Sequence, residues 1–381
     1  MDKMADVLGR AGAWCGQNKY LSAIKNAFQN FMPLTIAGAI GVLWCNVLVN
    51  DQTGLGLFFK PIMALDFLNP AFQAVNFCTI SCITVGITLG IAQEIGVWNM
   101  GAERAGYIPG LVGLAAWLSV TNTSHMVDGA KEAFTGIAGN ELGATGLFTG
   151  MIIGVLSVEL FCFFEKQDAL KIKMPEQVPP GVARAFEVLV PATITLIITA
   201  CIGSACYNLT GLYLNDVIKN GIQGPLGAVG ATIPGVMIIY LVIMLFWLVG
   251  IHGNNMLSAV KEALFTPLAL ENVEAFNKGE TPKNIINMYF LQMCGEFGGS
   301  GVTIGLVIAI MIFGKREDNK AIATLSLVPG LFNINETVTF GIPMVLNPIL
   351  GIPFVVAPLV TIIIGYVLTV IGFCPVACLT V

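Results

Sequence analysis

The 381-residue chain is far more apolar than a water-soluble protein, since 56% of its residues are Ala, Val, Ile, Leu, Met, Phe, Trp, Tyr or Cys and only 11% are charged. A soluble domain of this size could not cover its surface with so few charges, because about a quarter of the residues in soluble domains are charged. The net charge of −5 offers no basic surface that would attract nucleic acid. Composition therefore excludes a soluble enzyme, a nucleic-acid-binding protein and a disordered chain, and it predicts an integral membrane protein.

The first residues, 1–27, contain four Lys or Arg residues and lack the compact apolar core of a cleavable signal peptide. This segment predicts a retained amphipathic helix. Apolar segments follow along the rest of the chain, so we expect an all-α polytopic bundle of about eight to ten transmembrane helices. The predicted spans are residues 28–49, 71–92, 106–121, 143–164, 186–208, 225–250, 288–313 and 355–379, with less regular apolar stretches at 254–270 and 321–354.

Basic residues are concentrated in two intervals, 1–27 and 165–185, which contain four Lys or Arg residues each. Cytoplasmic loops carry an excess of Lys and Arg, and four predicted spans separate the two intervals, so we expect both intervals and the N-terminus on the cytoplasmic side. The intervals 251–287 and 314–320 contain three each, and one ordinary span between them cannot place both inside. Either an additional crossing lies there, or part of the chain enters and leaves the membrane by the same face.

The Pro- and Lys-containing interval 165–185 also marks the clearest boundary between two membrane subdomains, although the span at 186–208 fits either side. We expect an N-terminal subdomain, residues 1–210, and a C-terminal subdomain, residues 211–381.

Residues 330–358 do not have the pattern of a straight transmembrane helix. Four prolines recur there every five residues, and a proline inside a helix costs about 3 kcal/mol. The stretch is nevertheless too apolar for an aqueous loop, and non-helical backbone at membrane depth occurs only inside protein or along a watery cavity. The pattern therefore predicts a re-entrant element and a candidate site. The prolines are Pro343, Pro348, Pro353 and Pro358.

Glu336 is the only charged residue between Ala321 and Val381. A carboxylate in an apolar segment costs on the order of 2.5–3.5 kcal/mol to insert, so it should have a partner or a function. The alternative is a glutamate at a loop tip on the membrane surface that serves no function.

His252 is the only group in the uncharged segment 220–260 that titrates near neutral pH. It lies between Gly250 and Gly253, which suits an exposed turn, and Asn254 next to it supplies the amide donors and acceptors that bind sugar hydroxyls. The alternative interpretation is that His252 is a structural histidine, hydrogen-bonded between helices. Trp247 either stacks on a sugar ring or belongs to an interfacial aromatic belt.

The motif CGEFGGSG, residues 294–301, contains Glu296, the sole charge between residues 287 and 313. The motif lacks the Lys and Ser/Thr spacing of a phosphate-binding loop, so its glycines are expected to serve close packing, and Glu296 is either structural or functional. His125 is expected in a solvated loop, and Asn140 and Gln223 are weaker candidates for a cavity. The chain has no zinc-protease, hydrolase, Walker A or metal-ligand motif, so no cofactor or metal is expected.

Five segments together resemble the membrane (IIC) component of bacterial phosphoenolpyruvate-dependent sugar phosphotransferase systems, in the lactose/cellobiose/diacetylchitobiose family. The resemblance covers nearly the whole chain. The segments are NKYLSAIKNAF (18–28), MPLTIAG (32–38), GIHGNN (250–255), GGSG (298–301) and NETVTFGIPMVLNPILGIPF (335–354).

This resemblance implies a multi-pass homodimer in the bacterial plasma membrane. Its first half would supply most of the dimer contact, and its second half would hold the sugar between re-entrant hairpins. It also implies that His252 and Glu336 lie at the sugar hydroxyl that becomes phosphorylated. Asn335 and Trp247 resemble sugar contacts, and Gln223 and Asn140 match less clearly. Asn254 is a candidate contact within the GIHGNN motif.

Two features depart from the family pattern. The family usually has Pro after the glutamate, where this chain has Thr337. The chain also stops at Val381, where relatives continue through a Trp-containing segment that helps to close the site, so we expect a truncated C-terminus.

The function expected from these motifs is a sugar permease that takes part in phosphoryl transfer. It would bind a β-linked disaccharide, diacetylchitobiose or cellobiose, and present its 6-hydroxyl to the phosphocysteine of a separate IIB subunit. A base must accept the hydroxyl proton, and either His252 or Glu336 can do so. The alternatives are a proton-coupled disaccharide transporter without phosphorylation and a structural membrane scaffold.

Overall fold

The computed structural model describes residues 2–51, 54–125, 134–175, 177–331, 333–342, 344 and 347–378, and it is almost entirely helical. The strands in this part of the chain, β1 (Ser124–His125) and β2 (Phe134–Thr135), form a two-residue antiparallel ladder. The chain divides into two compact units. We call residues 19–225 the N-terminal unit, and residues 2–18 together with 226–378 the C-terminal unit.

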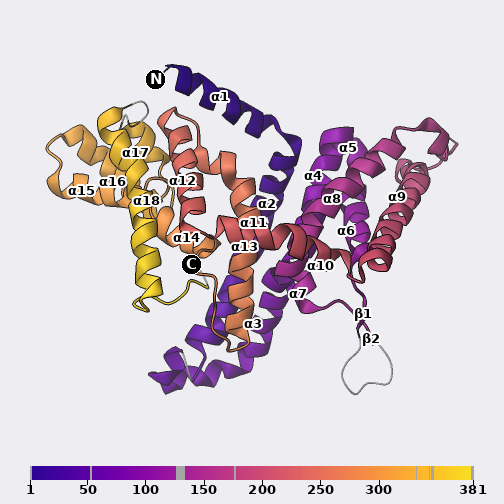
Figure 1. The fold of residues 1–381 in the computed structure, drawn as a ribbon, viewed down its shortest axis with the longest axis horizontal. Helices are drawn as coiled ribbons and strands as arrows, with labels where there is room; N and C mark the ends of the chain where they lie inside the picture. The colour runs from indigo at the N-terminus through magenta and orange to yellow at the C-terminus, as the bar shows by residue number, and fades with distance from the viewer. Residues whose placement is uncertain are drawn as a thin grey trace. The chain divides into compact units, whose positions relative to one another are not determined.

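The N-terminal unit is a bundle in which α4 packs against α2, α6 and α8, and α9 packs against α6 and α8 (Figure 1). Small residues allow these helices to approach closely: a Cβ atom on Gly113 would overlap Ala92, and one on Gly150 would overlap Thr88. The α-helices are α2 (Lys19–Leu43), α3 (Asn69–Asn76), α4 (Ile83–Met100), α5 (Ala102–Ala105), α6 (Ile108–Val120), α7 (Gly139–Leu142), α8 (Ala144–Glu165), α9 (Pro180–Thr210) and α10 (Leu214–Ile218). Shorter π- and 3₁₀-helical turns are η1 (Trp44–Leu48), η2 (Leu55–Leu57), η3 (Lys60–Leu68), η4 (Phe77–Ser81), η5 (Asp168–Leu170) and η6 (Lys219–Gln223).

Polar contacts place several basic residues at the same end of the N-terminal unit. Lys19, at the start of α2, forms an ion pair of 2.6 Å with Glu159 in the C-terminal part of α8. Arg104, after α4, forms one of 2.8 Å with Glu165 at the end of α8. The start of α2 and the interval 165–185 therefore lie at one end of the bundle, which is the arrangement that four predicted crossings require.

The C-terminal unit has two buried clusters of apolar side chains. One lies around Tyr240, Phe265 and Leu291, and the other around Trp247 and Phe354. The unit contains α1 (Asp2–Gln17), α12 (Ile233–Leu248), α13 (Gly253–Asn277), α14 (Met288–Gly295), α15 (Thr303–Phe313), α16 (Glu317–Leu331), α17 (Glu336–Gly341) and α18 (Pro348–Val370), and α11 (Gly224–Gly230) begins at the boundary between the units.

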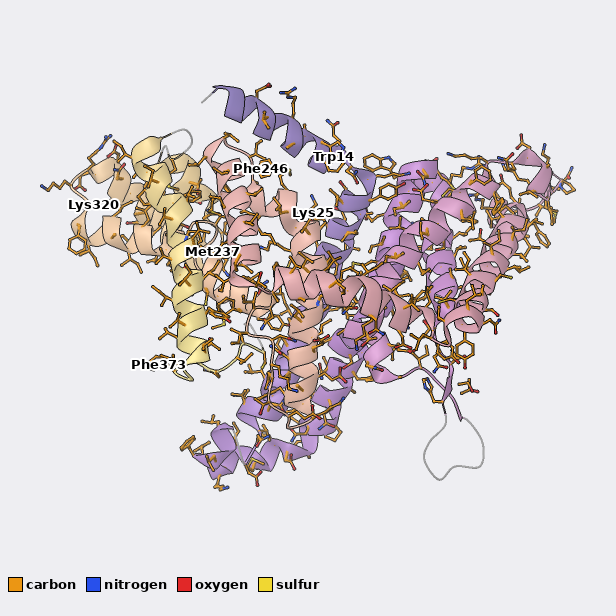
Figure 2. The ribbon with its side chains drawn as sticks, viewed as in Figure 1. Trp14, Lys25, Met237, Phe246, Lys320 and Phe373 are labelled. Atoms are coloured by element: carbon orange, nitrogen blue, oxygen red, sulfur yellow. The ribbon has the colours of Figure 1, made fainter. Side chains whose placement is uncertain are left out.

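In the part of the chain that the structure describes, four helical segments are long and apolar enough to cross a membrane, and two bent helix pairs raise the number to six if each pair is one span. Large apolar side chains are exposed along these helices, and Figure 2 labels one of them, Phe373, beyond the end of α18. These observations confirm the predicted class, a polytopic helical membrane protein. The single segments are Lys19–Leu48, Ala144–Glu165, Pro180–Thr210 and Ile349–Val370, and the pairs are Lys60–Ser81 with Ile83–Met100 and Leu214–Gly230 with Ile233–Leu248.

One predicted span is wrong, and another is bent. The segment 288–313 is not one helix, because residues 296–302 separate α14 from α15 and neither helix exceeds about 17 Å at 1.5 Å per residue. The segment 225–250 is broken by a bend of 76° between α11 and α12. The Thr232 hydroxyl accepts a hydrogen bond from the Gly235 backbone N–H there, and this cap starts a new helix.

The prolines of 330–358 interrupt the chain less than expected. Helix α18 begins at Pro348 and continues through Pro353 and Pro358, so the prediction of non-helical backbone is wrong for residues 348–358. Pro348 occupies a position where no helical N–H is needed, and the Asn347 side chain caps the helix by accepting from the N–H groups of Ile349 and Leu350. Internal prolines are tolerated in membrane helices where neighbouring groups satisfy the freed carbonyls.

Candidate functional site

Three segments that are distant in sequence meet at Ser300 in the C-terminal unit. Asn254 donates from Nδ2 to Ser300 Oγ at 2.9 Å, and Asn335 donates from Nδ2 to the Ser300 backbone oxygen at 2.9 Å. Ser300 is 2% exposed and Asn335 is 3% exposed, so both bonds are shielded from water. Buried amide hydrogen bonds of this kind fix the backbone segments that they join. The loop of His252 and the start of α17 are therefore held on either side of the GGSG motif.

The glycines of the GGSG motif are required by backbone geometry. Gly298, Gly299 and Gly301 have φ values of 80°, 92° and 81°, which side chains rarely adopt. A Cβ atom on Gly299 would lie 2.6 Å from Cβ of Asn335, and one on Gly301 would overlap the Phe354 ring. The motif therefore allows close approach of α17 and α18.

The start of α17 is also tied to the same motif. Asn333 Oδ1 accepts from the Gly298 backbone N–H at 2.8 Å, and Asn335 Nδ2 donates to Thr339 Oγ1 at 3.1 Å. Glu336 is the first residue of α17, and its side chain lies outside the described side chains. Its backbone directly follows Asn335 and is thus held at the Ser300 contact.

His252 is the residue before the first turn of α13. Its Nδ1 atom accepts a hydrogen bond from the Asn255 backbone N–H at 3.2 Å, which caps the helix. Its ring lies 4.4 Å, between centroids, from the ring of Trp247, and the two planes are tilted by 46°. Trp247 is 1% exposed and packs edge-on against Phe354, with centroids 6.3 Å apart. The burial of Trp247 excludes a place in an exposed aromatic belt and makes the indole a support for the imidazole.

Asn254 has capacity for a further hydrogen bond. Its Nδ2 atom is used by Ser300, whereas its Oδ1 atom is buried and has no hydrogen-bond partner among the described residues. A buried acceptor without a partner costs on the order of 1–3 kcal/mol, so it suits a ligand hydroxyl.

Glu296 has a structural environment. It accepts hydrogen bonds from the Tyr240 hydroxyl at 2.8 Å and from the ammonium group of Lys261. Lys261 is 5% exposed and Tyr240 is fully buried. The pair links α12, α13 and the turn after α14, so of the two roles left open for Glu296 the structure favours the structural one.

The weaker candidates lie in the N-terminal unit. Gln223 is buried and donates from Nε2 to the Ala144 backbone oxygen at 3.3 Å, whereas Asn140 is exposed on α7. Neither is brought to the Ser300 contact by the packing of the C-terminal unit. His125 is half-buried in β1, 3.5 Å from Asn122 Nδ2, and is less solvated than expected.

Sequence reasoning missed Ser300, Asn333, Thr339 and Lys261. Ser300 had a visible signal, because it lies inside the glycine motif, but the motif was assigned to packing alone. Asn333 and Thr339 are ordinary polar residues of a loop and a short helix. Their role depends on contacts 35 and four residues away along the chain, respectively.

Comparisons with known proteins identify the family. Residues 25–358 match the family described as "Phosphotransferase system, EIIC". The chain is 32% identical over 378 residues to the PTS system oligo-beta-mannoside-specific EIIC component of Bacillus subtilis (strain 168), covering 98% of this chain and 83% of the relative. It is 30% identical over 425 residues to the PTS system cellobiose-specific EIIC component of Lactococcus lactis subsp. lactis (strain IL1403), covering 96% and 86%.

A solved structure has the same fold. The transporter ChbC, the IIC component from the N,N'-diacetylchitobiose-specific phosphotransferase system, superposes with a TM-score of 0.86 at 29% identity, covering 96% of this chain and 84% of that one. The motif resemblance is thus confirmed by matches over nearly the whole length. The chain belongs to the EIIC family of phosphotransferase-system membrane components.

Proposed function

We propose that this chain is the permease of a phosphotransferase system for a β-linked disaccharide, with diacetylchitobiose and cellobiose as the first substrates to test. The observation that carries the proposal is the Ser300 contact, which holds the loop of His252 and the start of α17 together. The names of the relatives support β-linked sugars as the class, since they include cellobiose and N,N'-diacetylchitobiose components.

The hydrogen bond at Nδ1 of His252 supports a division of roles between the two titratable residues. A neutral imidazole has one acceptor nitrogen and one donor nitrogen, and the Asn255 N–H uses Nδ1 as the acceptor. The proton of neutral His252 is therefore placed on Nε2, where it can donate to a sugar oxygen and orient it. A different group must accept the hydroxyl proton, and we assign that role to Glu336.

The remaining contacts bind the sugar. The Oδ1 atom of Asn254 accepts a hydrogen bond from a sugar hydroxyl. Trp247 packs against the imidazole of His252 on the side of the apolar core. Asn335 orients α17 through Ser300. The phosphoryl group comes from the phosphocysteine of a separate IIB subunit, whose approach requires the site to open toward the cytoplasm. Asn140 and Gln223 stay candidates for contacts from the N-terminal unit, and a homodimer with a cytoplasmic N-terminus completes the proposal.

Sugar uptake into membrane vesicles tests the proposal. Vesicles that contain this chain and are supplied with phosphorylated IIB should accumulate phosphorylated disaccharide. Vesicles without IIB should only exchange unmodified disaccharide across the membrane. Accumulation of unmodified sugar driven by a pH gradient would instead establish the proton-coupled alternative. A scaffold would bind neither disaccharide.

Variants separate binding from phosphoryl transfer. Glu336→Gln should retain disaccharide binding and lower the rate of IIB-dependent phosphorylation by about 10²-fold or more, the usual loss when a general base is removed. His252→Ala should weaken both binding and phosphorylation. The matched controls are Glu317→Gln, an exposed glutamate in α16, and His125→Ala, the other histidine of the chain. If a variant and its control lose binding or phosphorylation to the same extent, the roles assigned to Glu336 and His252 are wrong.

A further inference from the structure

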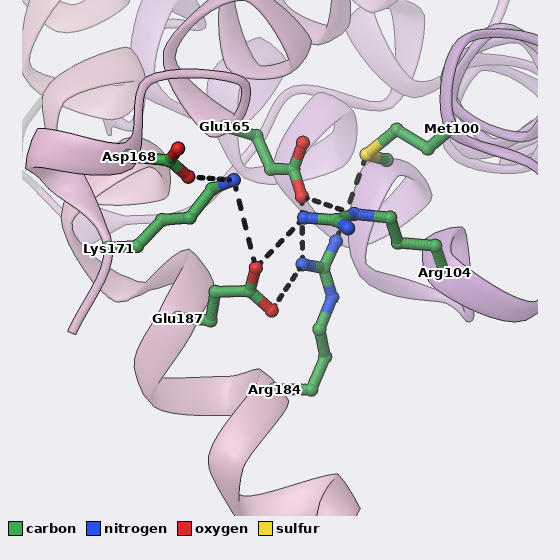
Figure 3. Close-up of polar contacts among 7 residues, drawn as sticks. All are labelled: Met100, Arg104, Glu165, Asp168, Lys171, Arg184 and Glu187. Atoms are coloured by element: carbon green, nitrogen blue, oxygen red, sulfur yellow. Dashed lines mark hydrogen bonds and ion pairs between the residues drawn. The ribbon is translucent and has the colours of Figure 1, made fainter. Parts of the chain in front are cut away.

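A basic cavity at one end of the N-terminal unit is not used by the proposed transport site. It has a volume of about 690 Å³ and lies where α8 ends and α9 begins. Figure 3 shows its charged lining residues other than Lys173, together with the neighbouring Glu165 and Met100 and the polar contacts that they form. The cavity is lined by Arg104, Asp168, Lys171, Ile172, Lys173, Met174, Pro180, Ala183, Arg184 and Glu187.

The cavity lining carries more positive than negative charge. Four cationic side chains line it against the carboxylates of Asp168 and Glu187, and the buried carboxylate of Glu165 adds one further negative charge. The Lys171 ammonium beside Asp168 holds the pKa of that carboxyl below its ordinary value. The carboxyl of Asp168 is therefore counted as a negative charge at neutral pH. Among the side chains that the structure describes there, a net positive charge of one therefore remains for an anion.

Two of the cationic side chains, Arg184 and Lys173, have hydrogen-bond donors that could bind a ligand. Arg184 uses Nη1 for both Glu165 and Glu187, each at 2.8 Å, whereas its Nη2 reaches only the weakly accepting sulfur of Met100 at 3.8 Å. Its Nε atom is buried and has no hydrogen-bond partner among the described residues. Lys173 is exposed and forms no ion pair within the described chain. A guanidinium with unused donors and an exposed ammonium that line the same cavity form a donor set that binds a phosphate group.

The cavity lies at the depth of lipid headgroups. Helix α9 has 31 residues and is about 46 Å long, which exceeds the roughly 30 Å thickness of the hydrocarbon core. Its charged residues, Arg184 and Glu187, are both in the first eight positions, and residues 188–210 carry no charge. The uncharged part fills the hydrocarbon core, so the first turns of α9 lie in the headgroup layer.

Apolar groups occur in the same cavity. Ile172, Met174, Pro180 and Ala183 share its lining, and Ile172 is 39% exposed. On the next turns of α9, Phe186 and Leu189 are 39% and 49% exposed. A free phosphate ion has no apolar groups to bury against such a surface, whereas the glycerol and the first methylene groups of a lipid can pack against it.

We infer that this cavity binds the phosphodiester headgroup of an anionic membrane lipid, with Lys173 and Arg184 as its phosphate contacts and the exposed face of α9 along its acyl chains. Basic pockets beside membrane helices at the cytoplasmic face are a recurrent form of lipid recognition. The site is separate from the sugar site and does not depend on the substrate proposed above.

Native mass spectrometry of the full chain in detergent tests the inference, with dioleoylphosphatidylglycerol, dioleoylphosphatidylcholine and inorganic phosphate as probes. One phosphatidylglycerol should bind at least fivefold more tightly than phosphatidylcholine, because a basic side chain near an anionic lipid contributes about 1 kcal/mol. Inorganic phosphate at millimolar concentration should not displace it. Displacement by phosphate, or equal binding of the two lipids, would overturn the inference.

Two variants and one control locate the site. Lys173→Gln should weaken phosphatidylglycerol binding about fivefold without breaking the ion pairs of Glu165 and Glu187. Ala183→Phe should weaken it by filling the cavity with no change in charge. Lys166→Gln is the control, because Lys166 is exposed in the same interval and does not line the cavity.

If Lys166→Gln and Lys173→Gln weaken phosphatidylglycerol binding equally, the lipid is attracted by the general positive charge of this surface and not by the cavity. That result would overturn the inference. Unchanged lipid binding in Lys173→Gln and Ala183→Phe, with loss of IIB-dependent phosphorylation, would also overturn it. That result would assign the cavity to the protein partner.

Discussion

Ser300 shows how a single small residue positions the candidate site. Its hydroxyl accepts from Asn254 and its backbone oxygen accepts from Asn335, so it joins two loops that are 81 residues apart. Asn254 in turn is the residue whose buried, unpartnered oxygen we propose as a sugar contact. On this proposal, the orientation of a sugar contact depends on a residue that need not touch the sugar.

Ser300→Ala should lower disaccharide affinity about tenfold. It removes the acceptor of Asn254 and leaves that amide free to rotate, a loss of roughly 1–1.5 kcal/mol. Ser326→Ala is the matched control, because Ser326 is equally buried and its hydroxyl bonds only to the Ile322 carbonyl of its own helix. Equilibrium binding of the disaccharide to both purified variants is the measurement. An unchanged affinity in Ser300→Ala would contradict the positioning role.

Glu141 is a residue of the N-terminal unit whose burial predicts a pH effect. It is 8% exposed in α7, and its Oε2 atom has no hydrogen-bond partner within the described chain. Burial raises the pKa of this carboxyl above its ordinary value, nearby Asp216 acts in the same direction, and His125 opposes the shift. Because the folded pKa exceeds the unfolded pKa, ionisation of Glu141 destabilises the fold increasingly as the pH rises from the unfolded pKa through the folded one.

Glu141→Gln should therefore raise the melting temperature in detergent at pH 8 and have a smaller effect at pH 4.5. Glu103→Gln, at an exposed position in α5, should leave the melting temperature unchanged at both pH values. A stabilisation by Glu141→Gln that is the same at both pH values would show that the carboxyl is not the cause.

At the scale of elements, the turn of residues 296–302 holds the C-terminal unit together. Glu296 binds Lys261 of α13 and Tyr240 of α12 at one end of the turn, and Gly298 binds Asn333 before α17 at the other. The turn replaces what hydropathy alone interprets as the middle of a transmembrane helix. Three elements, α12, α13 and the start of α17, thereby depend on a turn of seven residues.

Lys261→Met should destabilise the protein by about 3–5 kcal/mol, because it leaves the carboxylate of Glu296 buried without its cation. The double variant Lys261→Met/Glu296→Gln should recover most of that loss, since the uncompensated charge is then absent. Thermal unfolding in detergent measures both. A double variant that is as unstable as the single one would show that packing of the lysine chain, and not its charge, is responsible.

Gly299→Ala should disrupt the same turn. The substitution forces a side chain into a positive φ and against Asn335, and both effects displace the start of α17. Gly305→Ala is the control, because Gly305 lies inside α15 with open space around it, where alanine favours the helix. Disaccharide binding should be lost in the first variant and retained in the second, and retention in both would contradict the close-packing role of Gly299.

At the scale of the whole molecule, the ion pairs of the N-terminal unit constrain the topology. Lys19, Arg104 and Arg184 belong to three different helices, α2, α5 and α9, yet all three pair with carboxylates in the C-terminal part of α8. Such contacts are possible only when successive helices run in opposite directions between the two ends of the bundle. Together with the excess of Lys and Arg at this end, they favour its cytoplasmic placement.

Cysteines introduced at Arg10 and Lys166, in a background without native cysteines, should react with a membrane-impermeant maleimide only after the cells are permeabilised. A cysteine at Lys60, one predicted crossing away, should react in intact cells. Labelling of Lys166→Cys in intact cells would reverse the proposed orientation of the N-terminal unit.

The sequence by itself determined the class of the protein, the family and the motifs that meet at the candidate site. A scarcity of charges excludes a soluble fold at once, and rare groups in apolar surroundings, such as His252 and Glu296, are conspicuous because burying them is costly. The predicted span at 143–164 agrees with α8 to within one residue at each end, because its apolar run has a single internal charge and no internal proline.

Only the tertiary structure decided where helices break and which polar residues meet. Hydropathy does not separate one long helix from two short ones here, because the turn at 296–302 interrupts the apolar segment with a single charged residue and its bend is stabilised by distant partners. The prolines of α18 were over-interpreted for the same reason, since their cost depends on groups that lie elsewhere in the fold. The role of Ser300 is likewise a property of two contacts that only folding brings together.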